Sequence, residues 1–256
     1  MPVTGSIPRA ARLLDVLAQA PEGMVLADIV ACSGFTKTTT FRVLGALIEA
    51  RLVEQDPLGR SYRLGRKLSD LARQATRADI AAMAVHGCQR LAELSEDTVF
   101  LSVPEGALSI CVLRKTGAFP VRTLTLDQGD ARPLGVGAGS LALYCAMSPA
   151  RRHAACRVNR AWLAEYGMDE ATLEAEQRTF RKLGYALNRG RVVEGTSAVA
   201  TPVFTPGGDL IAALAIGAID ARMGSERIRE LLVPALKREA ELLGKRMQDR
   251  EGKAHE

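Results

Sequence analysis

The sequence predicts an α+β fold in two domains, an N-terminal winged helix-turn-helix and a second domain of helices around a largely antiparallel sheet. Two short helical patterns separated by Ser33-Gly34 are the first observation. Two strand-like runs on either side of Asp56-Pro57 are the second. The third is the succession of hairpin-linked strands and helices after residue 98, which is typical of antiparallel α+β domains.

The first domain is expected to open with a helix. Ser6 is a good cap for it, because a serine hydroxyl accepts from an unpaired amide of the first turn. The helix runs to about Ala20 and ends at Pro21-Glu22-Gly23. Met24-Val25 is then expected to form a very short strand against the wing.

A helix-turn-helix is predicted over 26–48. Leu26, Ile29 and Val30 recur at helical spacing, and Gly34 ends this helix because glycine adopts left-handed backbone angles at little cost. Thr36 is the expected cap of the second helix. Its buried stripe is expected to consist of four apolar residues, Phe41, Leu44, Leu47 and Ile48.

Threonines and cations occupy the start and outer face of this second helix, although β-branched threonine is a mediocre helix former. Short hydroxyls and cations suit phosphates and base edges in a DNA major groove. The helix residues expected to contact DNA are Thr36, Lys37, Thr38, Thr39, Thr40 and Arg42. The alternative is an ordinary helical hairpin with a solvated basic face, which requires turn, stripe, threonine run and wing to coincide.

The runs 52–55 and 61–64 predict a hairpin, since Asp-Pro opens the turn between them and a glycine stands near its end. A hairpin directly after a recognition helix is a wing, and its Arg60 and Arg63 are expected to lie on the DNA backbone. Seven cations and three anions give 36–67 a net charge of +4, against +5 for the whole chain. Positive charge is therefore concentrated in this stretch.

A helical pattern over 64–84 contains no glycine or proline after Gly65, so we expect a connecting helix and not a flexible linker. The second domain follows. Its expected elements are helices near 80–94, 139–146, 150–158 and 169–183, strands at 98–103, 108–114, 121–126, 185–189, 197–204 and 210–219, and a last helix from 225 that Pro234 kinks.

Composition excludes several classes of protein. Of 256 residues, 47% are hydrophobic and 25% charged, which is typical of a soluble globular chain. No apolar run reaches the roughly 20 residues that cross a bilayer, and no signal peptide is recognisable. The five cysteines form no CxxC and no cluster with metal-ligand spacing. We therefore expect no metal, no cofactor, no membrane association and a reducing cytoplasmic location.

Several short motifs occur in a characteristic order. In 6–68 they are Arg12-Leu13-Leu14-Asp15-Val16-Leu17, Gly34-Phe35-Thr36-Lys37-Thr38-Thr39, Arg42-Val43-Leu44 and Tyr62-Arg63-Leu64-Gly65. Further along stand Arg132-Pro133-Leu134, Gly184-Tyr185-Ala186 and Ala198-Val199-Ala200-Thr201-Pro202-Val203. In the order and spacing of these motifs the chain resembles the IclR family of bacterial transcriptional regulators over almost its whole length.

The resemblance implies a second domain similar to a GAF domain, whose sheet holds a small effector near the start of a helix. The implied effector positions are Gly137, Ala138, Gly139, Ser140, Asn188, Ala198, Ala215 and Gly217. Of the four strand positions, three lack side-chain hydrogen-bonding groups (Ala198, Ala215 and Gly217), so a larger or more apolar pocket is expected than one for the smallest keto acids. From the residues alone, the glycine-rich stretch 135–140 is either an anion site or a turn packed closely against the sheet.

These observations divide the chain into a DNA-binding domain over 6–68, a connecting helix over 69–84 and a GAF-like effector-binding and oligomerisation domain over 85–250. They predict a regulator, a repressor of a catabolic operon, that binds double-stranded operator DNA as a homodimer or homotetramer. A small organic acid or aromatic effector is expected to change its operator affinity. No nucleophile-base pair, metal cluster or paired carboxylates are visible, so no catalytic residues are expected. The alternative is a small-molecule-binding enzyme with an accessory N-terminal domain.

Overall fold

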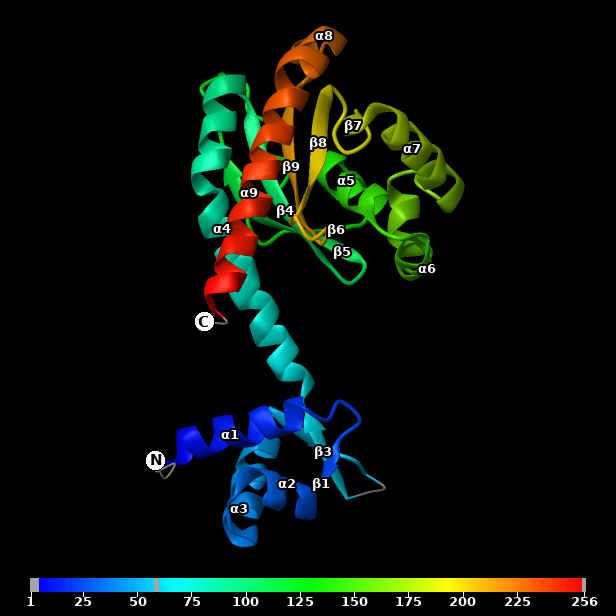
Figure 1. Cartoon of the computed structure of the whole chain (residues 1–256). Coiled ribbons are helices and arrows are strands. Elements are labelled where there is room, and N and C mark those ends of the chain that lie inside the picture. Colours follow the sequence, from blue (N-terminus) through cyan, green and yellow to red (C-terminus); the bar gives the residue numbers. More distant parts are fainter. Residues whose placement is uncertain (1–4, 58–59, 255–256) are drawn as a thin grey trace. The chain divides into compact units, whose positions relative to one another are not determined.

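The computed structural model describes residues 5–57 and 60–254 (Figure 1). Contacts divide the chain into two compact units, with the boundary between Thr76 and Arg77. This boundary lies inside one long helix, α4 (Arg66–Ser95). The two helical patterns expected over 64–84 and 80–94 therefore belong to a single continuous helix.

The first unit contains three helices and a small sheet. The helices are α1 (Ser6–Ala18), α2 (Leu26–Ser33) and α3 (Lys37–Glu49), and the strands are β1 (Met24–Val25), β2 (Val53–Gln55) and β3 (Ser61–Leu64). The strands are antiparallel in the order β1-β3-β2, so the predicted short strand against the wing is confirmed. All these elements share one apolar core, formed by Leu13, Val16, Leu17, Ile29, Val43, Leu44, Leu47, Val53 and Tyr62.

Local sequence explains the helix ends of this unit. Gly34 ends α2 with a φ of 75° in the left-handed region, as predicted. The prediction that Ser6 caps the first helix is wrong, because Ser6 is itself the first helical residue. Gly5 occupies the cap position, and no side chain bonds the free amides there.

The second unit is built on a six-stranded sheet. Its strands are β4 (Thr98–Glu105), β5 (Leu108–Lys115), β6 (Ala131–Pro133), β7 (Ala186–Arg189), β8 (Thr196–Phe204) and β9 (Leu210–Ile219). They lie in the order β6-β5-β4-β9-β8-β7, and each pair of neighbours is antiparallel. The predicted α+β class with an antiparallel sheet is confirmed.

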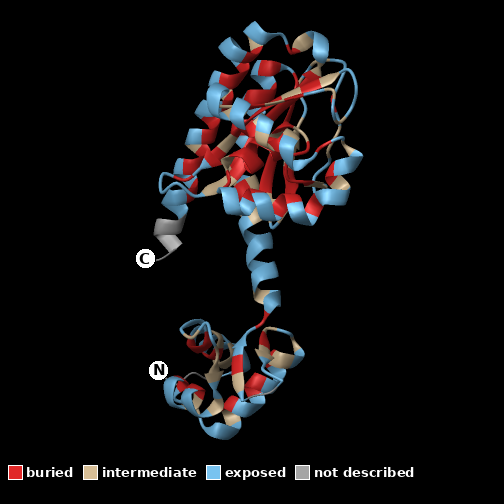
Figure 2. Ribbon diagram, turned by 90° about the vertical axis from the view of Figure 1, so that its right-hand side faces the viewer, coloured by how far each residue is buried: buried red, intermediate tan, exposed pale blue. Residues whose placement is uncertain are grey.

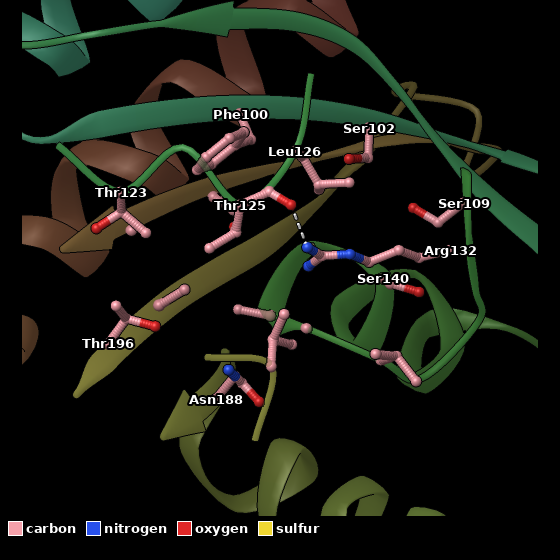
Figure 3. A pocket seen from close by; sticks show the side chains of 18 of the residues that line it. Phe100, Ser102, Ser109, Thr123, Thr125, Leu126, Arg132, Ser140, Asn188 and Thr196 are labelled. Carbon is pink, nitrogen blue, oxygen red and sulfur yellow. Dashed lines mark hydrogen bonds between the residues drawn. The ribbon is translucent and has the colours of Figure 1, made fainter. Parts of the chain in front are cut away.

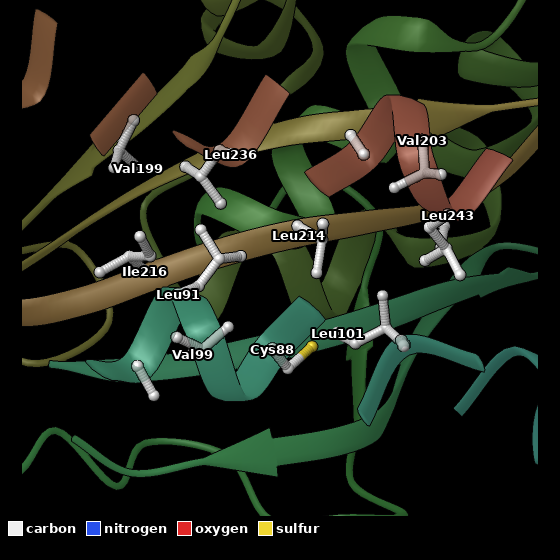
Figure 4. Packing of buried hydrophobic residues seen from close by; sticks show 14 of the residues in the cluster. Cys88, Leu91, Val99, Leu101, Val199, Val203, Leu214, Ile216, Leu236 and Leu243 are labelled. Carbon is white, nitrogen blue, oxygen red and sulfur yellow. The ribbon is translucent and has the colours of Figure 1, made fainter. Parts of the chain in front are cut away.

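Helices cover both faces of this sheet (Figure 1). On one face lie the second half of α4 and the last helix, α9 (Val233–Ala254), and on the other α5 (Ala138–Ala146), α6 (Pro149–Glu165) and α7 (Glu170–Leu183). Each face has its own apolar core. In the first core Leu91 of α4 and Leu236 of α9 pack against Ile216 of β9 (Figure 4). Figure 2 shows the buried residues of this unit gathered on the strands and on the helix faces turned toward them.

One predicted strand is absent. The alternating segment 121–126 has no regular secondary structure, although its residues are all described. At this edge of β5 the short strand β6 pairs with Leu108, Ser109 and Ile110, and 121–126 forms no ladder with the remaining residues of β5. The segment is held instead by two arginine side chains, since Arg114 donates to Leu126 O at 2.9 Å and Arg132 donates to Thr125 O. We call residues 116–130 the strap.

The start of the C-terminal helical region is irregular. A short 3-10 turn (η1, Asp220–Arg222), a single α turn (α8, Ser225–Arg227) and a π-helical stretch (η2, Ile228–Leu232) precede α9. Pro234 follows the π-helical stretch and has no amide hydrogen for the helical ladder. The disturbance expected at Pro234 therefore takes the form of a widened turn just before it. Among the described residues, no helix has the length and apolar character that crossing a membrane requires.

Candidate functional site

The start of α3 is fixed by a threonine cap. The Thr36 hydroxyl accepts from the Thr39 amide at 3.3 Å, and it also bonds the Thr39 hydroxyl at 3.0 Å. The predicted cap is confirmed. In the first turn of the helix, which begins at Lys37, Lys37 and Thr38 are exposed to solvent.

The two faces of α3 differ from the prediction at two adjacent positions. Phe41 was expected in the buried stripe, but it is 63% exposed. Thr40 was expected at a DNA interface, but it is fully buried and its hydroxyl donates to Thr36 O at 3.1 Å. A threonine can fill a core position when its hydroxyl is bonded within the helix, so Thr40 takes the place in the stripe that had been given to Phe41.

The outer face of α3 therefore carries both polar and apolar side chains. Lys37, Thr38, Phe41 and Arg42 are exposed, and Thr39 is half-buried. Gly45 lies one turn beyond Phe41 on the same face, and a Cβ added there would meet nothing within 4 Å. Packing inside the unit therefore does not require a glycine at this mid-helix position, where glycine costs about 1 kcal/mol relative to alanine.

The wing carries two exposed arginines, Arg60 and Arg63, and Arg63 is paired with a carboxylate. Arg63 of β3 lies opposite Glu54 of β2, and its Nη2 is 3.1 Å from Glu54 Oε2. The Arg66 amide also donates to Glu54, at 3.3 Å. Both contacts hold the pKa of the Glu54 carboxyl below its usual range, with the Arg66 bond as the larger cause. Of the predicted turn over 56–60, residues 58–59 lie outside the described residues.

A cavity in the second unit is lined by all eight positions that the resemblance had indicated. Gly137, Ala138, Gly139 and Ser140 come from the start of α5, and Asn188, Ala198, Ala215 and Gly217 from β7, β8 and β9. Including its mouth, the empty space is about 560 Å³. The enclosed part of this space is about 40 Å³. Figure 3 shows the side chains around it.

Strand register explains how distant positions reach this cavity. Asn188 pairs with Ala198, and Ala198 pairs with Gly217, so the three lie in one row across the sheet. A Cβ at Gly217 would lie 3.3 Å from the Phe100 ring, which makes glycine the residue that leaves room for this aromatic wall. The small residues of the sheet therefore open the space that larger side chains surround.

The start of α5 combines a tight turn with unpaired helix amides. Gly137 occupies the cap position with a φ of 80°, and no side chain caps the helix. The Ser140 hydroxyl accepts from the Gly135 amide at 3.1 Å and donates to Pro133 O at 2.8 Å. Both of the alternatives for this stretch therefore find support. Ser140 fixes the turn, whereas no side chain caps the first turn of α5, whose residues line the cavity.

The wall of the cavity is more polar than expected. The additional polar side chains come from β4, β5, β6, β8 and the strap, and they are Ser102, Ser109, Arg132, Thr196, Ser197, Thr123 and Thr125. Thr123 is buried, and its hydroxyl has no hydrogen-bond partner in the described part of the chain. Sequence patterns did not assign these residues to the site. The strap segment 121–126 was interpreted as a strand, and Arg132 stood in a segment of mixed character. A lone arginine next to the glycine-rich stretch was the one available signal.

Groups that hold metals are absent from the described residues, since no three His, Cys, Asp or Glu side chains cluster there. Four of the cysteines are buried. Burial raises the pKa of Cys88 and of Cys145 to about 12 and that of Cys111 to about 11. These thiols are therefore packing groups and remain protonated at neutral pH.

Two family models match this chain. The IclR helix-turn-helix domain matches residues 6–57, and the bacterial transcriptional regulator IclR C-terminal domain matches residues 72–243. The first match covers α1 to β2, and the second includes the whole six-stranded sheet.

Characterised regulators are similar along most of their length. The HTH-type transcriptional regulator Rv1719 of Mycobacterium tuberculosis is 31% identical over 75% of this chain and 74% of its own. XynR of Escherichia coli is 25% identical over 87% and 89%, and the HTH-type transcriptional repressor AllR of the same species is 24% identical over 87% and 83%.

Solved structures share the fold. The crystal structure of an IclR transcriptional regulator from Silicibacter sp. TM1040 has a TM-score of 0.57 and 25% identity, and the match covers 94% of this chain and 96% of that one. An IclR-family regulator from Rhodococcus sp. has a TM-score of 0.64 at 22% identity, covering 93% and 92%.

Proposed function

Because the chain belongs to the IclR family of bacterial transcriptional regulators, we propose that it is a repressor that releases its operator when a small organic acid or aromatic effector enters the cavity. The family pairs a DNA-binding domain with an effector-binding one and is not a family of enzymes, so the enzyme alternative is wrong. The observation that carries the proposal is the presence of two separate sites: an exposed basic face on α3, and a cavity lined by all eight implied effector positions.

The proposed DNA surface consists of the outer face of α3 and the tip of the wing. Lys37, Thr38 and Arg42 are exposed there, and they offer cations and a hydroxyl to base edges in the major groove. Phe41 adds an apolar ring of the kind that packs on the methyl group of thymine. Arg60 is placed on the DNA backbone, whereas Arg63 contributes less because Glu54 neutralises part of its charge. Thr36 and Thr39 shape the helix start, and Thr40 is withdrawn from the surface.

Two copies of this surface are proposed to act together. One helix and one wing reach few base pairs, so a homodimer, or a tetramer of two dimers, doubles the contacts and matches a palindromic operator. In this proposal residues 6–68 bind DNA, 85–250 bind the effector and associate, and the intervening 69–84 connect them. Operator DNA lies in the bacterial cytoplasm, which is where the protein is proposed to work.

The effector is proposed to lie against the start of α5. The amides of Ala138 and Gly139 belong to the first turn of an uncapped helix, and the positive end of the helix dipole favours an anion there. Phe100, Val136 and Val192 supply apolar surface for the rest of the molecule. Repression is proposed from the similarity to AllR, which is named as a repressor, and a catabolic operon is the proposed target.

Gly139 offers a direct test. A Cβ at this position would lie 3.6 Å from Ala215 and 3.7 Å from the Ser102 hydroxyl, so a small side chain fits and a branched one enters the cavity. The experiment measures operator binding of the wild-type, Gly139→Ala and Gly139→Val proteins against metabolites of the genes next to its own. We expect all three proteins to bind operator and only Gly139→Val to lose the response to the effector. A Gly139→Val protein that responds as wild type does would refute the location of the effector site.

A further inference from the structure

Arg132 reaches the cavity from β6, an edge strand of the sheet. Figure 3 shows its guanidinium extending toward the middle of the ring of lining side chains. A Cβ added at Gly137 would lie 2.9 Å from Arg132 Nη1, so the guanidinium lies directly against the turn that begins α5. Gly137 leaves the space that this side chain occupies.

Arg132 has no directly bonded carboxylate partner in the described residues, although the charge of Asp130 acts on it at longer range. Its guanidinium donates a hydrogen bond to a neutral group, the carbonyl of Thr125 in the strap. No carboxylate of the described residues forms an ion pair with it. Arg114 makes a useful contrast, because it also donates to a strap carbonyl, yet Asp127 lies 3.3 Å from its Nη2. Burial lowers the pKa of Arg132, which is the direction expected for a cation that is desolvated and unpaired.

The start of α5 places a second positive group, the end of the helix dipole, next to Arg132. The amides that open α5 have no side-chain cap, and a helix start carries about half a positive charge. A guanidinium held beside an uncapped helix start repels it, and burial strengthens this repulsion. One anion between them would satisfy both, since it accepts from the guanidinium and from the helix amides together.

We propose that Arg132 is the charged anchor of the effector, and that the effector is a monocarboxylate whose carboxyl group lies between this guanidinium and the first turn of α5. This inference rests on the proposed function, because it identifies the effector class of the same cavity. The apolar body of the acid packs on Phe100 and Val192. The buried and unpaired hydroxyl of Thr123 is available to a second polar group on the ligand.

The test uses three acids, benzoate, phenylacetate and 3-methylbutanoate, each compared with its neutral amide and with inorganic phosphate. Thermal melting is measured for the full-length wild-type protein and for Arg132→Met, Arg132→Lys and the matched control Arg114→Met. At a hundredfold excess over its dissociation constant, a bound acid should raise the melting temperature of the wild type by about 5–10 °C. We expect at least one of the acids to raise the melting temperature of the wild type, and the corresponding amide to leave it unchanged. Arg132→Met should lose the shift, Arg132→Lys should keep part of it and Arg114→Met should keep it fully.

A measurement without any ligand complements this test. Arg132 and Arg114 each hold the strap through one carbonyl, but only Arg114 also pairs with a carboxylate. If Arg132 is a charge kept for a ligand, Arg132→Met without ligand should melt no lower than Arg114→Met. An arginine with a mainly structural role would give the opposite result, a melting temperature several degrees below that of Arg114→Met. The proposal is overturned if Arg132→Met melts lower in this way, if no acid stabilises the wild type, if phosphate alone does so, or if acids stabilise Arg132→Met equally.

Operator binding by the wild type is measured in the same samples. A protein that binds operator but no acid contradicts only the anchor, and one that binds no DNA contradicts the proposed function itself.

Discussion

Arg90 and Glu239 lie 149 residues apart, yet they join α4 to α9 through two parallel hydrogen bonds of 2.9 and 2.6 Å. The Glu239 carboxylate is buried, whereas the Arg90 side chain is half exposed. A Cβ at Gly87 would lie 2.8 Å from Glu239 Oε2, so α4 carries a glycine where this carboxylate approaches it. The pair fixes how the two helices meet on one face of the sheet.

Removing Arg90 should therefore destabilise the second unit. Arg90→Ala leaves a buried carboxylate without its partner, and we expect a loss of about 1–2 kcal/mol in the free energy of unfolding, less than for a fully buried pair because Arg90 is partly solvated. Urea denaturation measures this. The matched control is Lys245→Ala, which breaks the exposed pair with Glu241 on α9 and should change stability by less than about 0.5 kcal/mol. Equal effects of the two variants would contradict the structural role of Glu239.

On α3, Arg42→Ala should cost operator affinity selectively. If Arg42 contacts a base, the loss is about 1–3 kcal/mol on the operator and much smaller on unrelated DNA. Fluorescence anisotropy with both DNAs measures the difference. Arg181→Ala, an exposed cation of α7, is the control and should leave both affinities unchanged. Similar losses on both DNAs would place Arg42 on the phosphate backbone.

At the wing, Arg60→Ala should weaken all DNA sequences alike. A lost phosphate contact lowers the slope of log K against log salt by about one. The same change at Arg63 should have a smaller effect on the slope, because Glu54 already pairs with that side chain. A larger effect at Arg63 than at Arg60 would show that DNA displaces Glu54 from this pair.

Gly45→Ala separates stability from DNA binding. The position is helical, and an added Cβ meets nothing, so alanine should raise the free energy of unfolding by about 0.4–1 kcal/mol. On DNA the same methyl group would occupy the outer face of α3, and we expect weaker operator binding. A variant that is more stable and binds operator as tightly as the wild type would exclude a close approach of DNA at Gly45.

The sequence predicted what depends on local chemistry and missed what depends on neighbours. The left-handed Gly34, the Thr36 cap and the short strand against the wing follow from a few adjacent residues, and the structure has them. Phe41 was misplaced because spacing alone does not show whether Phe41 or Thr40 turns inward. The outcome depends on a bond between the Thr40 hydroxyl and Thr36 O that lets a polar residue enter the core.

The cavity shows the same division. Its glycine-rich helix start was visible in the sequence, whereas the strap was taken for a strand because its residues alternate in character. Alternation makes a strand only when the backbone pairs with a sheet edge, and here two arginine side chains bond the carbonyls of Thr125 and Leu126 instead. Arg132 lines the cavity because it lies against the turn that begins α5. This contact cannot be inferred from its position in the chain.

The buried thiols predict how stability depends on pH. Burial raises the pKa of Cys88 from 9.0 to about 12, and the adjacent Glu239 adds to the shift. Between these values the unfolded chain has lost the thiol proton and the folded chain keeps it, so stability is complete below pH 9 and falls as pH rises toward 12. Melting temperatures at pH 8 and pH 10 should differ less for Cys88→Ala than for the wild type. Equal differences would show that Cys88 does not titrate in this way.

Footprinting on the DNA that flanks its own gene, with and without the stabilising carboxylate, tests the account most directly. We predict two protected half-sites related by two-fold symmetry and centred about 10–10.5 base pairs, or a multiple of that distance, apart. The carboxylate should abolish this protection for the wild type and for Arg114→Met, but not for Arg132→Met. Absence of protection at moderate salt would contradict the regulator, and protection that persists at saturating carboxylate would contradict control through the cavity.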